Sequence, residues 1–361
     1  MRLAVLGGGH GALCMAADSS LAGHEVRLYL RNRERFAPTF ATRRIAISGA
    51  GRSGEAAISQ VTDDIRVALD GAELVLVPLP AYAHEAIARQ AAPHLQAGQI
   101  VYLTPGTFGS FVFAKTVHDL TGQSITTAEA ATLPYGTRIS GPSAVRVTMV
   151  ATHLPTGVFP AQHTPLAMER INAVYPAAEP VTDSLDAALL NVNGALHASL
   201  TIMNAGPIES KPAYDIHREG STPAILRVMA ALEGERIALR QALTYPPPHW
   251  SIMDYYAHKD WLYGVRGRQL VQEQSVWHEK IDFRGRYIEE DVRFGLALWR
   301  SLGRKLGVPT PLSDAFLHIA GAMNGADYAA TGQSLARLGL ADLEAPALKS
   351  LLKHGLEELG R

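Results

Sequence analysis

The chain opens with Met1-Arg-Leu-Ala-Val-Leu-Gly7-Gly8-Gly9-His10-Gly11-Ala12, a short apolar run that stops at a cluster of glycines. Residues 2–6 predict a buried strand, and residues 11–22 predict a helix that begins directly after the glycines. Gly7, Gly9 and Ala12 match the pattern G-x-G-x-x-G/A, whose small residues permit a tight turn and a close backbone approach to a pyrophosphate. The stretch therefore predicts a dinucleotide site formed by Gly7, Gly9, His10, Gly11 and Ala12.

The rest of the first half alternates short apolar strands with helices. Helices are expected at residues 83–92 and 109–120, and strands at residues 2–6, 25–30, 73–77, 99–103, 124–127 and 145–152. Such alternation is typical of a parallel sheet that helices cover on both faces. The expected fold class is α/β, with an N-terminal Rossmann-type doubly wound parallel sheet that forms a dinucleotide-binding domain over residues 1–183.

The second half is mostly helical. Long helices are expected near residues 184–206, 222–243, 287–306 and 310–324. At roughly 150 residues per domain, the chain is long enough for two domains. We expect an all-α C-terminal domain over residues 184–361, with the site in a cleft between the domains. Aromatic residues gather between Trp250 and Trp277, where they would either shape an apolar pocket for an amine or pack the helical domain.

Composition excludes several classes of partner. Lys and Arg number 33 against 34 for Asp and Glu, so the chain lacks the basic field that nucleic acid or an anionic membrane would require. The uncharged segment 187–208 carries too many Asn, His, Ser and Thr residues for a lipid-facing helix. We expect a soluble, cytoplasmic protein that binds neither nucleic acid nor membrane. Its apolar helices could form a homodimer interface, or could close on the first domain.

The second strand suggests which coenzyme is bound. NAD enzymes commonly place an acidic residue at its end to hold the ribose hydroxyls. Here the strand ends in Arg31-Asn32-Arg33, where a guanidinium can pair with a 2′-phosphate. Arg31 and Arg33 therefore favour NADPH over NADH; the alternative is that both arginines belong to a solvated loop.

A polar stripe lies on the apolar segment in the middle of the chain. At about 100° per residue, Asn193, His197, Thr201 and Asn204 share one face of a helix. Buried polar groups need partners, so the stripe meets either other protein groups or a ligand. His197 is the candidate general acid/base, because imidazole exchanges protons near neutral pH. Its carboxylate partner would be Glu290 or Asp291, although acidic residues there also suit the first turn of a helix.

Several motifs with consistent order and spacing extend over nearly the whole chain. They are the loop from Gly7 to Ala12, Val77-Pro78-Leu-Pro80-Ala-Tyr-Ala-His84, Thr104-Pro-Gly106-Thr107-Phe-Gly109, Ala128-Glu129-Ala130, Leu133-Pro-Tyr135-Gly-Thr-Arg138, Asn193-Gly-Ala-Leu-His197, Arg286-Tyr-Ile-Glu-Glu290-Asp291 and Gly307-Val-Pro309-Thr-Pro311. In these motifs the chain resembles the opine dehydrogenases, the octopine/nopaline dehydrogenase family. Enzymes of that family use NAD(P)H to join an α-keto acid reductively to the amino group of an amino acid.

The resemblance assigns roles to individual residues. It implies that His197 is the catalytic acid/base, that Asp291 is its partner and that Asn193 helps to place the substrate. Thr107, Glu129, Thr201 and Arg286 become substrate-binding candidates, with Arg284 as a second choice for the carboxylate anchor, and Pro78 joins the cofactor-binding residues. Thr107 and Ala130 stand where some relatives carry Gln and Thr, which removes or shortens a hydrogen-bonding side chain in each case.

Two other functions remain open from the sequence. One is reduction of a 2-keto acid to a hydroxy acid, as in ketopantoate-reductase-like enzymes. Those enzymes look to use a lysine carried on a helix, and this chain has no lysine between Lys115 and Lys211. The other is a non-catalytic dinucleotide-binding protein. No metal site is expected, because the histidines lack the spacing that ligands require.

Overall fold

A computed structural model describes residues 1–273 and 281–357, so Trp277 of the aromatic segment lies outside the described residues. Contacts divide the chain into two compact units. The first is made by Met1–Ala188 together with Lys349–Arg361, and the second by Leu189–Leu348. The boundary thus lies between Ala188 and Leu189, a few residues after the predicted one at 183.

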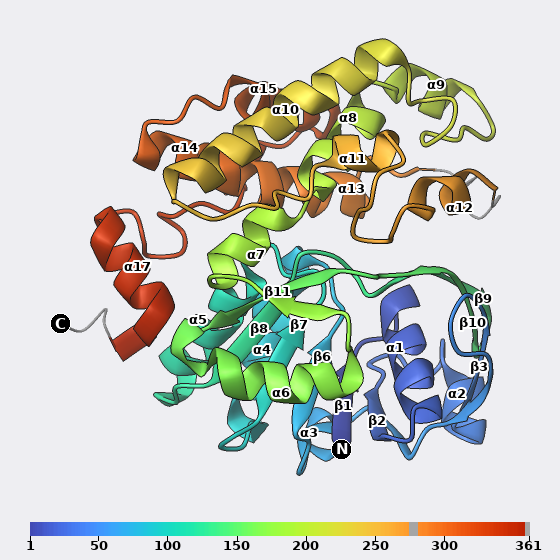
Figure 1. Ribbon diagram of the computed structural model, residues 1–361. Helices are drawn as coiled ribbons and strands as arrows, with labels where there is room; N and C mark the ends of the chain where they lie inside the picture. Colours follow the sequence, from blue (N-terminus) through green and yellow to red (C-terminus); the bar gives the residue numbers. More distant parts are fainter. Residues whose placement is uncertain (274–280, 358–361) are drawn as a thin grey trace. The chain divides into compact units, whose positions relative to one another are not determined.

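The first unit is built on a mainly parallel sheet (Figure 1). Its strand order is β12-β11-β8-β7-β6-β1-β2-β5, and every neighbouring pair is parallel except β8 with β11. The chain leaves β1 toward β2 and β5 and then returns to β6 on the other side, so the order reverses between β1 and β6. The strands are β1 (Arg2–Leu6), β2 (Glu25–Tyr29), β5 (Gln60–Thr62), β6 (Leu74–Val77), β7 (Ile100–Leu103), β8 (Thr126–Ala130), β11 (Leu154–Phe159) and β12 (Ala178–Pro180).

Helices cover both faces of this sheet. On one face, α3 (Ile65–Leu69), α4 (His84–Ala91) and α5 (Gly109–Thr121) bury one apolar cluster with alternate residues of β1, β6 and β7. Tyr102 of β7 points to the other face, where it contacts Tyr175 at the end of α6 (Thr164–Val174). Tyr175 in turn contacts Tyr135, whose hydroxyl donates to Asp18 of α1 (His10–Leu21). The α/β class with a parallel-rich, doubly covered sheet is therefore confirmed.

A second, smaller sheet was not predicted. Its order is β4-β3-β10-β9, formed by β4 (Gly54–Ala57), β3 (Arg44–Gly49), β10 (Ala144–Val150) and β9 (Tyr135–Gly141). The predicted strand at 145–152 belongs to this sheet and not to the main one, which corrects that expectation. All four strands contact α1. Because α1 lies between two sheets, its residues from Gly11 to Ser19 are all buried and it has no polar face for periodicity to detect.

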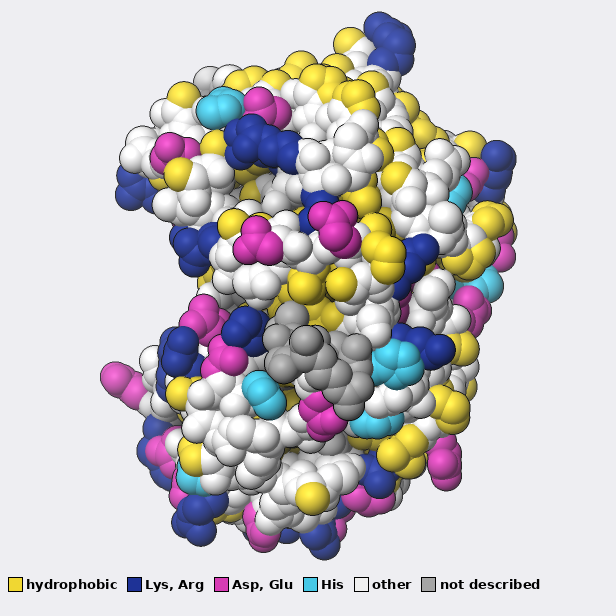
Figure 2. All heavy atoms as spheres, turned by 90° about the vertical axis from the view of Figure 1, so that its left-hand side faces the viewer, with side chains coloured by type: hydrophobic (Ala, Val, Ile, Leu, Met, Phe, Trp, Pro, Cys, Tyr) yellow, Lys and Arg dark blue, Asp and Glu magenta, His cyan; other side chains and the backbone are white. Residues whose placement is uncertain are grey.

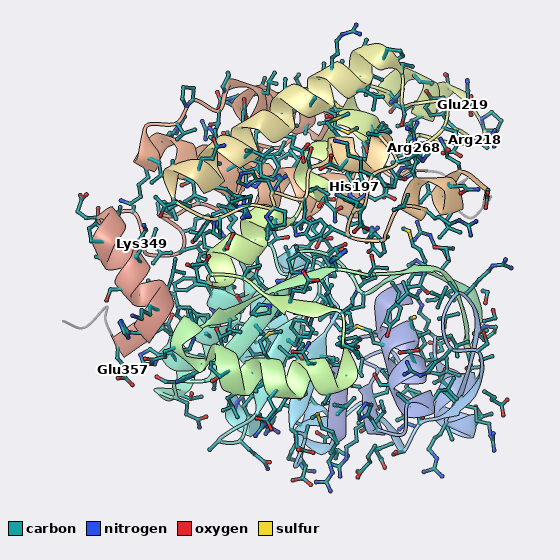
Figure 3. The ribbon with its side chains drawn as sticks, in the orientation of Figure 1. His197, Arg218, Glu219, Arg268, Lys349 and Glu357 are labelled. Atoms are coloured by element: carbon teal, nitrogen blue, oxygen red, sulfur yellow. The ribbon has the colours of Figure 1, made fainter. Side chains whose placement is uncertain are left out.

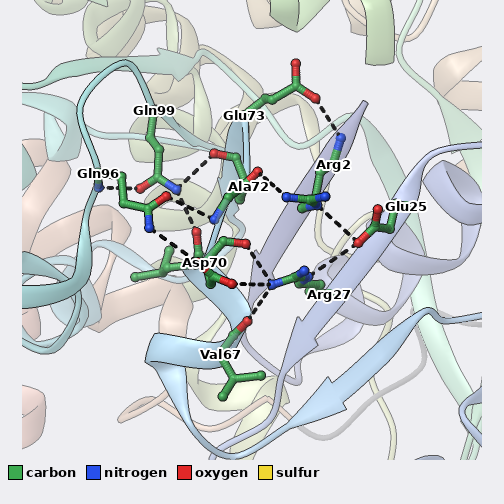
Figure 4. Close-up of polar contacts among 11 residues, drawn as sticks. Arg2, Glu25, Arg27, Val67, Asp70, Ala72, Glu73, Gln96 and Gln99 are labelled. Carbon is green, nitrogen blue, oxygen red and sulfur yellow. Dashed lines mark hydrogen bonds and ion pairs between the residues drawn. The ribbon is translucent and has the colours of Figure 1, made fainter.

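The two edges of the main sheet differ in chemistry. At the amino edge, charged and amide side chains bind the ends of strands and loops to one another (Figure 4). Arg2 donates to Glu25 and to the Gly71 carbonyl, Arg27 donates to the Val67 and Asp70 carbonyls, and Gln99 donates to the Leu69 and Ala72 carbonyls. The carboxyl edge carries instead the glycine-containing loops after β1 and β7.

The end of the chain packs with the first unit, whereas residues 184–361 were expected to form one domain. Helix α17 (Ala345–His354) begins in the second unit, but residues from Lys349 onward belong to the first. Leu351, Leu352 and Leu356 are buried there, and Gln162 donates to the His354 carbonyl at 3.2 Å. The helical pattern of this segment gave no indication of which unit its apolar side chains would contact.

The second unit is helical, as expected, but its helices are shorter than predicted. The segment 184–206 forms α7 (Ser184–Leu190), α8 (Asn193–Ile202) and α9 (Ala205–Ser210) instead of one helix. The segment 287–306 contains α13 (Arg286–Glu289), a π-helical turn (Asp291–Leu296) and α14 (Ala297–Leu306). The other helices are α10 (Pro223–Ala242), α11 (Ile252–Tyr256), α12 (Gly267–Glu273), α15 (Pro311–Asn324) and α16 (Tyr328–Thr331).

Charge on the molecular surface is mixed: on the face drawn in Figure 2, basic side chains are interspersed with acidic ones. Within residues 1–273 and 281–357, no helix is long and apolar enough to cross a membrane.

A buried histidine connects the loops at the carboxyl edge. His84 is 1% exposed, and its Nε2 lies 2.8 Å from the Leu79 carbonyl oxygen. The ring occupies the space beside Gly109, where a Cβ would lie 2.0 Å from Nδ1. Burial lowers the pKa of His84 to about 4. His84 is therefore neutral in the native protein, with its proton on Nε2.

This burial predicts a loss of stability in acid. An unfolded histidine takes up a proton near pH 6.5, whereas His84 takes one up only near pH 4, so its contribution is present above pH 6.5 and is lost as the pH falls toward 4. The gap between these pKa values corresponds to about 3 kcal/mol. His84→Gln keeps a donor for the Leu79 carbonyl. Between pH 6.5 and 4, its free energy of unfolding in urea should fall by about 3 kcal/mol less than that of the wild type. The exposed His318→Gln should behave as wild type; equal losses in His84→Gln and wild type would contradict the prediction.

Candidate active site

The glycine loop lies at the point where the strand order reverses. It follows β1, and the loop after β6 stands beside it: a Cβ on Gly7, whose φ is +132°, would lie 2.8 Å from the Leu79 side chain. A Cβ on Gly11 would lie 3.0 Å from Leu133 and 3.4 Å from Pro78. Open α/β sheets bind ligands at this reversal. The predicted residues Gly7, Gly11 and Pro78 are thus brought together.

The start of α1 suits a pyrophosphate. The helix begins at His10, and its N-cap Gly9 provides no side-chain cap for the first N–H groups. A Cβ on Gly9 would meet nothing within 4 Å, so the space in front of these N–H groups is open. The buried Ala12 allows the close packing of helix on strand. These residues fit a dinucleotide, whose phosphates would accept from N–H groups in the first turn of α1. The His10 ring turns away, and its Nδ1 accepts from the Ile139 N–H at 2.8 Å.

The two arginines after β2 are not equivalent. Arg33 pairs with Asp63, with Nε 3.0 Å from Oδ2, and its guanidinium lies 4.4 Å from the centre of the Phe40 ring. Arg31 is exposed, and in the described part of the chain its guanidinium makes no hydrogen bond or ion pair. Of the two predicted phosphate ligands, Arg31 is therefore the one whose charge has no acidic neighbour bonded to it.

Two predicted substrate-binding residues lie in or beside the loop after β7. Thr107 lies in this loop, 5% exposed, with a left-handed φ of 55°. Glu129 of β8 is fully buried, and both of its carboxylate oxygens accept hydrogen bonds from the backbone at the start of α5. The Glu129 carboxylate therefore faces the loop from inside the unit, and its contact with a substrate stays a prediction.

Helix α8 presents the first half of the polar stripe and encloses the second. His197 is 7% exposed and Asn193 is half-buried, one turn apart on the helix (Figure 3 labels His197). Thr201 is 0% exposed and lies on the enclosed part of the stripe, and its contact with a substrate stays a prediction. Asn204 lies beyond the end of α8, where it donates to the Leu200 and Gly220 carbonyls and accepts from Tyr214.

The carboxylate partner of His197 is Asp291. Its Oδ2 lies 2.6 Å from Nδ1 of His197, and both residues are buried. Burial raises the pKa of Asp291 well above its usual value, while the positive charge of Arg286 lowers it. A carboxylate that accepts from Nδ1 fixes the tautomer and leaves Nε2 as the nitrogen that exchanges a proton with a substrate.

A π-helical turn, Asp291–Leu296, begins at the residue that contacts His197. The Gly295 N–H donates to the Glu290 carbonyl at 3.1 Å, five residues back, so this turn holds one residue more than a turn of α-helix. Gly194 permits the approach, because a Cβ there would lie 3.1 Å from Trp299 and 3.3 Å from Leu296. Sequence spacing assumes a regular helix and cannot reveal this extra residue.

Tyr287 was missed by the sequence reasoning. Its ring centre lies 4.1 Å from that of His197, with 32° between the planes. The Arg286 guanidinium lies 5.2 Å from the centre of the same ring. Arg286, Tyr287, Asp291 and His197 thus form one cluster. The second-choice anchor Arg284 precedes this cluster in the chain, and its backbone N–H donates to Asp282 at 2.8 Å. Tyr287 stands inside the motif that supplied Arg286 and Asp291, which was the available signal.

The aromatic segment packs the helical unit. Tyr255, Tyr256 and Trp261 are buried, and Tyr255 contacts both of the others at centre-to-centre distances of 5.2 and 5.1 Å. Of the two interpretations of this segment, packing is therefore the one that its described residues support. In the described residues, no group of three His, Cys, Asp or Glu side chains is placed to hold a metal ion.

Comparison with known proteins connects both units to one family. Residues 180–324 match the family model for the α-helical domain of NAD/NADP octopine/nopaline dehydrogenase. An opine dehydrogenase of Arthrobacter sp. (strain 1C) is 30% identical over 354 residues, which cover 97% of this chain and 98% of that protein. A tauropine dehydrogenase of Arabella iricolor is 26% identical and covers 76% of each chain.

Solved structures show the same fold. Octopine dehydrogenase with NADH and pyruvate superimposes with a TM-score of 0.73 at 18% identity, covering 97% of this chain and 98% of that one. Identity of 30% along nearly the whole length, together with the match of the helical domain, establishes the relationship. This chain belongs to the opine dehydrogenase family.

Proposed function

We propose that this protein is an NAD(P)H-dependent opine dehydrogenase that acts on a CH–NH bond. It condenses a pyruvate-like α-keto acid with the amino group of an amino acid or amine, and the resulting imine is reduced by hydride transfer. The observation that carries the proposal is the buried His197–Asp291 pair, 2.6 Å apart, in a chain whose other unit holds an open glycine loop at the reversal of strand order.

The chemistry requires a proton to move at nitrogen. The amino group attacks the keto carbon, water leaves and a C=N bond forms; its protonated form is the better hydride acceptor. Bound nicotinamide supplies the hydride for the imine carbon. In the oxidative direction His197 takes the proton of the secondary amine at Nε2, while Asp291 holds the ring and stabilises the imidazolium. General acid–base help of this kind is worth roughly a hundred- to ten-thousand-fold in rate.

The other site residues supply orientation. Asn193, one turn before His197, offers an amide to place the substrate. Arg286, whose charge acts on Asp291, is the cationic group for a substrate carboxylate. Thr107 offers a hydroxyl at the carboxyl edge of the first unit. The names of the relatives, which include opine, tauropine and octopine dehydrogenases, support an amino acid or amine as the second substrate.

The proposed reaction is tested by following nicotinamide absorbance with a keto acid alone, an amino acid alone, and the two together. Oxidation of the coenzyme should require both substrates. Oxidation by the keto acid alone would indicate a hydroxy-acid reductase, and coenzyme binding without oxidation by any pair would indicate a non-catalytic protein.

The role of Asp291 predicts a large loss of turnover in Asp291→Asn. The amide has the same size, but it can donate to Nδ1 of His197 and hold the wrong tautomer. We expect kcat to fall roughly a hundred- to ten-thousand-fold, with the Kd for coenzyme unchanged. Glu289→Gln is the matched control, because that carboxylate lies in the adjacent turn and binds Arg293 and Tyr328 instead. Wild-type kcat in Asp291→Asn would remove the pair from the mechanism.

The proposed preference for NADPH depends on Arg31. Because Arg33 is already paired with Asp63, Arg31→Ala should raise KM for NADPH about tenfold and change KM for NADH less than about twofold. Arg35→Ala is the control, since its guanidinium lies on the same turn, 5.3 Å from the Phe36 ring. Equal KM changes for the two coenzymes in Arg31→Ala would show that this arginine does not read the 2′-phosphate.

A further inference from the structure

We infer that Glu129 is a positioning residue, whose buried carboxylate holds the loop between β7 and α5 in the shape that presents Thr107 to the keto acid. The inference rests on the proposed function, because it names what orients one of the substrates in that reaction. In this role Glu129 does not touch the substrate; it holds the loop backbone, and the loop places Thr107.

The carboxylate is fully committed to the loop. Oε1 accepts from the Phe108 N–H at 2.8 Å, and Oε2 accepts from the Ser110 N–H at 2.8 Å and from the Ser110 hydroxyl at 2.5 Å. The first N–H groups of a helix lack partners within the helix and carry partial positive charge. Phe108, the N-cap of α5, provides no side-chain cap, so Glu129 supplies it from the neighbouring strand.

The loop needs this support because its backbone is strained. Thr107 and Phe108 have φ values of 55° and 64°, so two consecutive residues other than glycine occupy the left-handed region. L-residues adopt that conformation at a cost in free energy, so neighbouring contacts must hold it. Phe108 is also held by its side chain, which is fully buried and stacks on Phe111 with ring centres 5.0 Å apart.

Glycine at 106 shows how closely the carboxylate approaches. A Cβ on Gly106 would lie 2.3 Å from the Glu129 side chain, so any other residue would push the carboxylate and the loop apart. The Gly106 N–H donates to the Ala130 carbonyl at 3.2 Å, and the Gly109 N–H donates to the Gly106 carbonyl at 2.9 Å. The loop is therefore fastened to β8 through both the backbone and the side chain of neighbouring residues.

The position of Glu129 argues against a simple charge pair. Within the described residues it has no Lys, Arg or His partner, and its three donors lie at Phe108 in the loop and at Ser110 in the first turn of α5. Burial raises the pKa of Glu129 to about 7, and the hydrogen bonds from Ser110 and Phe108 act in the opposite direction. Keeping a carboxylate in this environment is costly, and a helix cap alone is commonly provided by a serine or threonine at no such cost.

The test is Glu129→Gln, which preserves size but replaces one acceptor oxygen with an NH₂ group that faces an N–H or O–H donor. Hydrogen–deuterium exchange of the peptide spanning Phe108 and Ser110 should become faster. KM for the keto acid should rise about tenfold, while kcat at saturation and the Kd for coenzyme stay within about twofold. Ser110→Ala removes only one of the three bonds, so it should give a smaller change in the same direction, and it serves if Glu129→Gln does not fold.

The matched control is Glu235→Gln in the second unit. Glu235 caps α15 in the same manner, accepting from the Leu312 N–H, the Ser313 N–H and the Ser313 hydroxyl at 2.6, 2.9 and 2.6 Å. Glu235→Gln should lower the unfolding temperature, as Glu129→Gln does, but its KM for the keto acid should equal that of the wild type. Faster exchange in Glu129→Gln without a rise in that KM would overturn the inference, because the cap would then be structural only. Wild-type protein that fails to couple the two substrates would overturn the proposed function itself, and the inference with it.

Discussion

The hydrogen bond between His197 and Asp291 sets the strictest demand on the helical unit, because each of its partners is costly to bury without the other. An isolated buried carboxylate loses its hydration, and a buried imidazole cannot easily take up a proton. Joined at 2.6 Å, the two groups satisfy one another. Where they meet, α8 packs closely at Gly194 against Leu296 and Trp299, and Asp291 begins a π-helical turn. Tyr287 then closes one side of the imidazole ring.

The first unit also buries carboxylates, and these hold helices in place. Glu129 caps α5 from inside the sheet, and Asp18 accepts from Tyr135 and Arg52 where α1 passes between the two sheets. Both carboxylates tie a helix to the strands behind it. The carboxyl edge can then consist of loops shaped by glycines, Pro78 and Thr107, in which backbone groups and small side chains face the ligand. Binding loops that are positioned by a rigid scaffold of helices and strands are common in sites of this kind.

The sequence was informative where chemistry depends on local spacing. The glycine loop, the strands β1, β2, β6 and β7 and the candidate acid/base His197 followed from short-range patterns, and the family resemblance selected Asp291. What sequence did not predict depends on long-range contacts. The strand at 145–152 joined an unforeseen sheet with β3, β4 and β9, and residues after Lys349 joined the first unit, because periodicity does not reveal what a face will pack against. Spacing alone could not choose between Glu290 and Asp291, and only the structure shows the contact of Asp291 Oδ2 with His197 Nδ1.

In the proposed reaction, hydride reaches the carbon of an imine formed from two substrates. The most direct measurement uses coenzyme deuterated at the transferable position and a ¹⁵N-labelled amino acid, followed by mass spectrometry of the product. The account predicts a secondary amine that carries deuterium on the former keto carbon and retains the ¹⁵N. Deuterium found instead in a 2-hydroxy acid without nitrogen would contradict it.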